Sequence, residues 1–188
     1  MKGARLLYDE ALGRAIERVA EPVRAFHRAA SPAHFTGRAS VERGTNPIAH
    51  FIADMMGLPA ASPDCAIEFR LTRDIDGVET WRRTFAGASF TSTQEQGRGG
   101  WSGFIVERFG PMSFALAATE ERGRLRVVPR HWSAFGIPMP AFLGPRADGI
   151  EHNANGRFNF DVVLCLPLLG LIVHYRGWLE PLGEAAML

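Results

Sequence analysis

The sequence predicts an α+β fold in which N-terminal helices pack on one large, strongly curved antiparallel β-sheet, either barrel-like or folded into two layers. Residues 1–58 have mainly helical patterning, whereas residues 59–180 alternate apolar and polar side chains between short turns. Short connections force antiparallel neighbours, and a twisted sheet of eight or nine strands curls or folds over. With 188 residues, 46% of them hydrophobic, the chain can bury the core of one domain over residues 1–188.

Two short helices are expected at the start of the chain. Residues 6–12 carry a short apolar face that ends at Gly13. Pro22 does not fit inside a helix, so it marks the first position of a second helix over residues 22–29. A stripe at three- and four-residue spacing indicates one buried face and consists of Ile16, Val19, Val23 and Phe26.

The third helix has the clearest boundaries. Asn46 suits the N-cap and Pro47 the first helical position. Gly57 supplies a C-cap, and Pro59 prevents the helix from continuing. The apolar stripe between them is expected to pack on the sheet and comprises Ile48, Phe51, Ile52, Met55 and Met56. We expect the three helices to cover one mouth or one face of the sheet.

Nine segments after Pro63 have the alternation and the flanking turn residues of strands. Asn155-Gly156 is a strong hairpin signal between two of them. Cys65 and Cys165 lie a hundred positions apart in this region, which favours buried thiols over a disulfide framework. The candidate strands are residues 65–71, 78–85, 89–94, 104–109, 112–119, 125–135, 150–154, 157–166 and 171–179.

A long apolar loop is expected over residues 134–145, because three prolines within residues 138–145 exclude a continuous strand. The loop can cover the core, act as a lid over an apolar ligand pocket, or form a partner-binding surface. The sequence leaves these alternatives open. The apolar side chains concerned are Ile137, Met139, Phe142 and Leu143.

Charge and targeting signals narrow the function classes. The formal net charge of +1, from 21 basic and 20 acidic residues, argues against a dedicated nucleic-acid-binding protein. Acidic residues occur within the first ten positions, so no signal peptide is expected. The longest apolar run, residues 162–173, is interrupted by Pro167 and Gly170 and is shorter than the roughly 20 residues of a membrane span. We therefore expect a cytoplasmic protein without a transmembrane segment.

Motifs of established chemistry are missing from the sequence. Residues 97–100 are rich in glycine but precede strand-like sequence, whereas phosphate-binding loops open a helix. H-E-x-x-H, C-x-x-C and G-x-S-x-G do not occur, and the six histidines form no ligand-spaced pair. We expect no cofactor and no metal, assign no catalytic residue, and favour a binding protein over an enzyme.

Polar clusters mark the candidate sites. Residues 35–44 can open a strand that carries Arg43. Glu107 and Arg108 are adjacent, so one of them is expected to face the covered side of the sheet.

A third cluster joins the last two strands. Asp161 can lie across from Arg176 and near His174 on the less apolar face of their hairpin. Such a patch is a solvated ion pair, an anion or carboxylate site at a barrel mouth, or a catalytic His174 oriented by Asp161. No nucleophile is identified for the last alternative.

A combination of motifs covers nearly the whole chain. The motifs are Val41-Glu42-Arg43-Gly44, Gly57-Leu58-Pro59, Trp81-x-Arg83-x-Phe85, Glu107-Arg108-Phe109-Gly110-Pro111, Arg157-Phe158-x-Phe160-Asp161-Val162 and Tyr175-Arg176-Gly177-Trp178-Leu179. In this combination the chain resembles an uncharacterised bacterial family, catalogued as a domain of unknown function, number four-one-six-six. Members are often fused behind saccharopine-dehydrogenase-like or epimerase-like dinucleotide-binding domains. The resemblance therefore implies a separate dinucleotide-binding enzyme as a partner, and it transfers no catalytic residue.

Three functions from different classes follow as hypotheses. The leading one is non-enzymatic binding of an apolar or amphipathic small molecule in a curved-sheet pocket, with Arg108 or Arg176 against an acidic head. The second is an accessory domain that docks on a dinucleotide-dependent oxidoreductase or epimerase. The third is an isomerase or hydrolase that uses His174 with Asp161 or Glu107. The candidate ligand-binding residues are Arg43, Glu107, Arg108, Asp161, His174, Tyr175 and Arg176.

Overall fold

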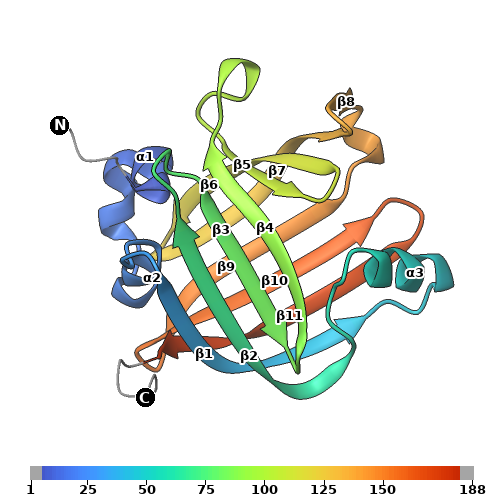
Figure 1. Ribbon diagram of the computed structural model, residues 1–188, viewed down its shortest axis with the longest axis horizontal. Coiled ribbons are helices and arrows are strands. Elements are labelled where there is room, and N and C mark those ends of the chain that lie inside the picture. The colour runs from blue at the N-terminus through green and yellow to red at the C-terminus, as the bar shows by residue number, and fades with distance from the viewer. Residues whose placement is uncertain (1–5, 183–188) are drawn as a thin grey trace.

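Ten antiparallel strands close into a barrel in the computed structural model, which describes residues 6–182 (Figure 1). The ring consists of β1 (Ala33–Arg43), β2 (Ser62–Arg73), β3 (Glu79–Phe85), β4 (Ala88–Gln96), β5 (Ile105–Phe109), β6 (Met112–Glu121), β7 (Arg124–Ala134), β9 (Arg146–Ala154), β10 (Arg157–Leu166) and β11 (Gly170–Pro181). Neighbours in the ring follow the chain from β1 to β7 and from β9 to β11. The ring closes where β7 pairs with β9 and β11 with β1.

The barrel-like alternative of the expected fold is thereby confirmed. Strand residues far outnumber helical ones, so the molecule is better described as a β-barrel with a few helices than as α+β. All nine strand candidates correspond to strands of the ring. A short eleventh strand, β8 (Ile137–Met139), pairs with β7 outside the ring.

Alternation places one side of each strand inside the barrel. In β2, the residues Cys65, Ile67, Phe69 and Leu71 are buried, and the residues between them are exposed. Cys65 and Cys165 are both free, and burial raises the pKa of the Cys65 thiol.

The segment before the third helix is a strand, as the polar cluster at residues 35–44 allowed, so residues 1–58 are less helical than expected. β1 pairs with β2 on one side and β11 on the other. Ala39 and Val41 face inward and are buried, while Arg38 is exposed. The apolar alternation of β1 is weak, because Gly37 and Ala39 are small residues at inward positions. The pairing with two long neighbours compensates for this weak local signal.

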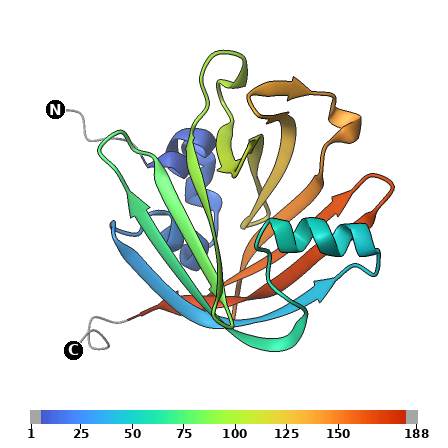
Figure 2. The same cartoon turned by 45° about the vertical axis from the view of Figure 1, so that its right-hand side comes forward.

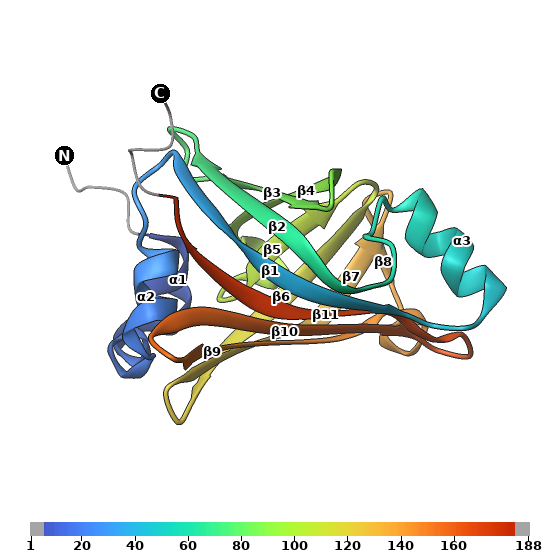
Figure 3. The ribbon, with the colours of Figure 1, turned by 90° about the horizontal axis from the view of Figure 1, so that it is seen from below.

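The helices lie at both ends of the barrel and not at one (Figure 3). α1 (Leu7–Leu12), the 3₁₀ helix η1 (Gly13–Arg18) and α2 (Glu21–His27) form a plug at one end. α3 (Pro47–Met55) lies at the other end, which we call the mouth. The expectation of a single covered mouth or face is therefore wrong. β1 accounts for this difference, since its 11 residues extend about 36 Å and carry the chain along the whole wall.

The plug packs as its stripe predicts. The side chains of the apolar stripe are 0 to 4% exposed, which confirms the expected buried face. The stripe consists of Ile16, Val19, Val23 and Phe26. The ring of Phe26 stacks on that of Phe158 in β10 with centroids 4.1 Å apart. The plug is therefore continuous with the core of the barrel.

α3 has the expected ends but the opposite orientation. The Asn46 side chain accepts a hydrogen bond from the Ile48 N–H at 2.9 Å, as an N-cap does. The buried residues of the helix are Ala49 and Ala53. Ile48, Phe51 and Met55, expected to pack on the sheet, are 57, 68 and 70% exposed. The two alanines permit close approach of α3 to β11, so the larger side chains are left facing solvent or the mouth.

The proline-rich loop does not cover the core. It forms β8 and a 3₁₀ turn, η3 (Ala141–Leu143), at the same end of the barrel as α3 (Figure 2). Ile137, Phe142 and Leu143 are 64, 72 and 48% exposed, so the core-covering alternative is wrong for these residues.

The close approach of β1 and β11 depends on glycine, which leads to a stability prediction. A Cβ at Gly37 would lie 1.8 Å from the Trp178 carbonyl oxygen, whereas a Cβ at Gly149 would lie 3.5 Å from its nearest atom. We expect Gly37→Ala to lower the free energy of unfolding by about 3 kcal/mol, measured by urea denaturation. Gly149→Ala is the matched control and should change it by less than about 0.5 kcal/mol. Equal effects of the two substitutions would contradict this explanation.

Candidate functional site

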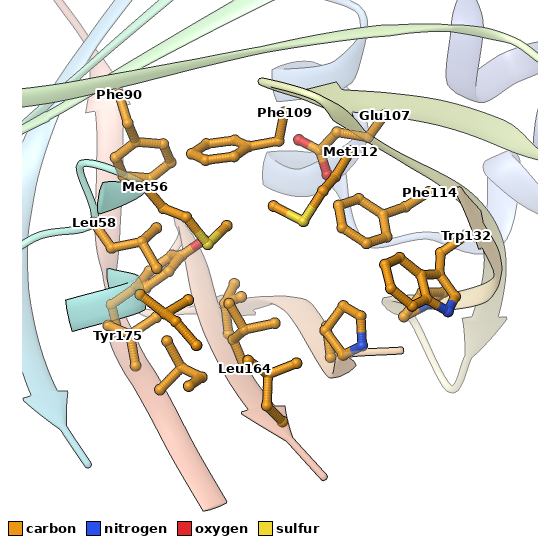
Figure 4. Close-up of a pocket in the computed structure, with 18 of the residues that line it drawn as sticks. Met56, Leu58, Phe90, Glu107, Phe109, Met112, Phe114, Trp132, Leu164 and Tyr175 are labelled. Carbon is orange, nitrogen blue, oxygen red and sulfur yellow. The ribbon is translucent and has the colours of Figure 1, made fainter. Parts of the chain in front are cut away.

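The barrel interior contains a cavity of about 360 Å³ on the side of α3 (Figure 4). Inward residues of the strands from β3 to β7, β10 and β11 form its walls. Side chains from the inner side of α3 and from the start of β9 border it near the mouth. Most of the lining is apolar, as shown by Met56, Phe90, Phe114, Trp132 and Leu164. The cavity therefore offers an apolar surface to a small molecule.

One carboxylate enters this apolar lining. Figure 4 shows the Glu107 side chain, from β5, beside Phe109 and Met112. Its Oε1 accepts hydrogen bonds from Ser92 Oγ at 2.6 Å and from Gln94 Nε2 at 3.4 Å. Both donors come from β4, the strand that pairs with β5. Their hydrogen bonds fix the carboxylate at the cavity wall.

Arg83 of β3 supplies the compensating positive charge. Its Nη2 lies 3.6 Å from Glu107 Oε1, and its Nη1 donates to Ser92 Oγ at 3.0 Å. The guanidinium also lies 5.1 and 5.4 Å from the ring centroids of Trp81 and Phe90. Aromatic faces attract a desolvated cation, so these rings favour a charged Arg83 inside the barrel.

Hydrogen bonds connect the polar cluster to the plug. This cluster consists of Arg83, Ser92, Gln94 and Glu107. The Tyr8 hydroxyl of α1 donates to Gln94 Oε1 at 3.1 Å. The His27 ring of α2 stacks on Tyr8 at 3.7 Å, and its Nε2 lies 2.5 Å from Glu151 Oε2 of β9. These contacts attach the plug to two parts of the wall.

The chain belongs to the DUF4166 family. The model of this family, described as a domain of unknown function, matches residues 19–179 and therefore includes nine strands of the ring and most of β11. No curated protein matches the chain. Within residues 6–182, no helix of this DUF4166 domain is long and apolar enough to cross a membrane.

Two of the residues proposed from the sequence meet in the cavity. Glu107 and Tyr175 both line it, and Tyr175 comes from β11. Burial raises the pKa of Tyr175; the charge of Glu107 also raises it and that of Arg83 opposes this. Within the described chain, the Tyr175 hydroxyl makes no hydrogen bond to another residue. It is therefore free to bond to a ligand.

Sequence reasoning missed Arg83, Ser92 and Gln94. Arg83 lies in the family motif Trp81-x-Arg83-x-Phe85, whose alternation places it on the inward face. This signal could have identified Arg83. Ser92 and Gln94 carried no comparable signal, because polar residues in a strand usually face solvent.

Arg43 and Arg108 do not line the cavity. The Arg43 guanidinium donates to the carbonyl oxygens of Leu58 and Pro59, both at 2.6 Å, and holds the segment after α3. Arg108 is half exposed and forms an ion pair with Glu95 on the outer wall. Of the neighbours Glu107 and Arg108, Glu107 is the one that faces inward.

The Asp161 cluster lies on the outer face of the barrel. His174 Nε2 is 2.7 Å from Asp161 Oδ1. Arg176 is opposite Asp161 in the strand register, but its guanidinium contacts Ser40 and Glu42, both at 3.4 Å. Because Tyr175 faces the cavity, its neighbours His174 and Arg176 face away from it. His174 therefore converges with Asp161 and not with Glu107.

The two tyrosines of the chain give a pH-dependent prediction. Burial raises the pKa of Tyr8 well above its ordinary value, as it does for Tyr175. A raised pKa in the folded state gives stability that is complete below the unfolded pKa of about 10 and is lost as the pH rises through the folded pKa. We expect phenolate absorbance to appear only together with loss of the circular dichroism of the fold. A tyrosine that ionises near pH 10 in the folded protein would contradict this.

Proposed function

We propose that this DUF4166 domain binds an apolar or amphipathic small molecule in the cavity and performs no catalysis on it. The observation that carries the proposal is the unfilled space of about 360 Å³ with its largely apolar lining. This volume is within the range of roughly 300–1,000 Å³ that small-molecule sites have. Leaving such a space unfilled costs packing free energy, and a bound apolar molecule would recover part of it.

The access route supports the same proposal. Trp132 and Met55 border the cavity, and Met55 is also 70% exposed, so the cavity reaches the surface beside α3. The plug occupies the other end of the barrel (Figure 1). A ligand therefore enters through the mouth and lies along the barrel interior.

The structure changes the expected partner of the ligand's polar end. Arg108 and Arg176 are on the outer wall, so neither can contact a molecule inside the cavity. Glu107, Arg83 and Tyr175 are the polar groups that such a molecule meets.

Filling the cavity tests the proposal. Ala147 of β9 lines the cavity and pairs with Leu164 in the neighbouring strand β10. The larger side chain in Ala147→Trp would therefore occupy the ligand space. We expect N-phenyl-naphthylamine to fluoresce on binding to the natural protein, and we expect Ala147→Trp to weaken its binding by roughly tenfold or more.

The control places the same indole outside the barrel. Ala66 of β2 is exposed, so Ala66→Trp should bind the probe like the natural protein. Circular dichroism should show that all three proteins are folded. An unchanged affinity in Ala147→Trp, or no binding by the natural protein, would overturn the proposed function.

A further inference from the structure

The unused hydrogen-bonding capacity of Glu107 indicates which ligands the cavity takes. Ser92, Gln94 and Arg83 all approach the same oxygen, Oε1. Among the described residues, Oε2 has no hydrogen-bond partner. It is also not one of the fully buried side-chain atoms that lack a partner. In Figure 4 the carboxylate borders the space between Phe109, Met112 and Phe114. Oε2 is therefore an acceptor in an apolar cavity.

We infer that the cavity selects molecules with an apolar body and a polar end that donates a hydrogen bond, such as a long-chain alcohol. This inference rests on the proposed function. A hydroxyl group can donate to Glu107 Oε2 and can also bond to Tyr175, whose hydroxyl is free. Leaving Oε2 unpaired when an apolar molecule fills the cavity would cost its desolvation free energy.

A carboxylate end fits this place poorly. It has no proton to donate at neutral pH, and it would lie beside the negative charge of Glu107. Arg83 does not reverse this preference, because its single positive charge already lies beside that of Glu107, and a second carboxylate would leave the three groups with a net negative charge. A fatty acid is therefore expected to bind more weakly than the alcohol of equal length.

Displacement of N-phenyl-naphthylamine by ligands of equal chain length tests the inference. We expect decanol or decylamine, whose ends donate, to bind roughly tenfold or more tightly than decanoate at neutral pH. The comparison of decanol with decylamine shows whether a neutral or a charged donor is preferred. Decanoate binding as tightly as both donors would overturn the inference and leave the proposed function intact, whereas no binding of any ligand would overturn both.

The substitution Glu107→Gln sharpens this test. A glutamine keeps an oxygen for Ser92 and turns an amide N–H₂ toward the cavity, so the preference should shift toward decanoate. The control Glu95→Gln changes the same residue type on the outer wall, where Glu95 pairs with Arg108. An unchanged order of affinities in a folded Glu107→Gln variant would contradict the inference.

The outside of the mouth carries an apolar surface that is separate from the cavity. Three segments that lie at the same end of the barrel (Figures 1 and 3) carry exposed apolar side chains. Phe51 and Met55 belong to α3, Ile137 and Phe142 to the loop of β8 and η3, and Leu168 to the turn between β10 and β11. We call these five residues the rim. Apolar side chains that gather at one end of a protein mark a surface that binds something apolar, whereas single scattered ones do not.

Positive charge lies beside the rim. A surface pocket of about 240 Å³ next to η3 is lined by Arg130, His131 and Arg146, and its lining contains no acidic side chain. Within residues 6–182, neither Arg130 nor Arg146 forms an ion pair. Asp54, an exposed acid of α3, pairs with Arg43 at 3.2 Å. Apolar groups next to uncompensated arginines are complementary to a bilayer with anionic lipids.

We propose that the rim docks on an anionic lipid surface, which places the mouth of the cavity against the membrane. The apolar side chains would enter the headgroup region, while Arg130 and Arg146 would contact phosphate groups. The cavity could then exchange ligands with the bilayer without passing them through water.

Vesicle co-sedimentation tests the docking. We expect binding to vesicles of phosphatidylcholine with phosphatidylglycerol, weaker binding in high salt, and little binding to phosphatidylcholine alone. Phe142→Ser and the double variant Arg130→Gln/Arg146→Gln should each reduce binding by roughly fivefold or more.

The matched control is Ile75→Ser, because Ile75 is 99% exposed in the turn between β2 and β3, away from the rim. It should bind vesicles like the natural protein. Equal losses in Ile75→Ser and Phe142→Ser would overturn the proposal. Co-elution with a dinucleotide-dependent enzyme that depends on Phe142, without any vesicle binding, would also overturn it and assign the rim to a protein partner.

Discussion

The pairing of β1 with β11 is the contact on which the rest of the structure depends. It joins the first and last strands of the chain over nine residue pairs, and thereby turns an open sheet into a ring. Gly37 and Gly177 allow this, because each lies where a side chain would meet the opposite backbone. Without the closure, the apolar inward faces of ten strands would have no common interior. The plug and α3 are useful only once that interior exists.

Within the closed barrel, polar groups are few and occur together. Arg83 is bonded to Ser92 and lies beside Glu107, and Gln94 connects this cluster to Tyr8 of the plug. Burying an ion pair contributes little net stability, since the desolvation of both charges offsets their attraction. A contribution to stability therefore does not account for the presence of Arg83 and Glu107 inside the barrel. A role in orienting a bound molecule explains why the pair lies at the wall of an apolar cavity.

The sequence predicted the strands well and the sites less well, for physical reasons. Alternation in β2 or β10 is a local property, so a strongly curved sheet, either barrel-like or two-layered, followed from strand number and short turns. α3 was correctly bounded by Asn46 and Pro47, but which face it buries depends on the small residues that meet β11, which no local pattern shows. Glu107 and Tyr175 were found as polar residues in strands, whereas their meeting requires strands far apart in sequence to close into a ring.

The most direct measurement of ligand binding inside the barrel is NMR of methyl-labelled protein during titration with decanol. Binding inside the barrel should shift the signals of methyl groups that face the cavity, such as those of Met56, Met112 and Leu164. Methyl groups of Ile16 in the plug and of the exposed Ile75 should not move. Shifts confined to exposed methyl groups, with the cavity methyl groups unchanged, would contradict the central claim that the barrel interior is a binding site.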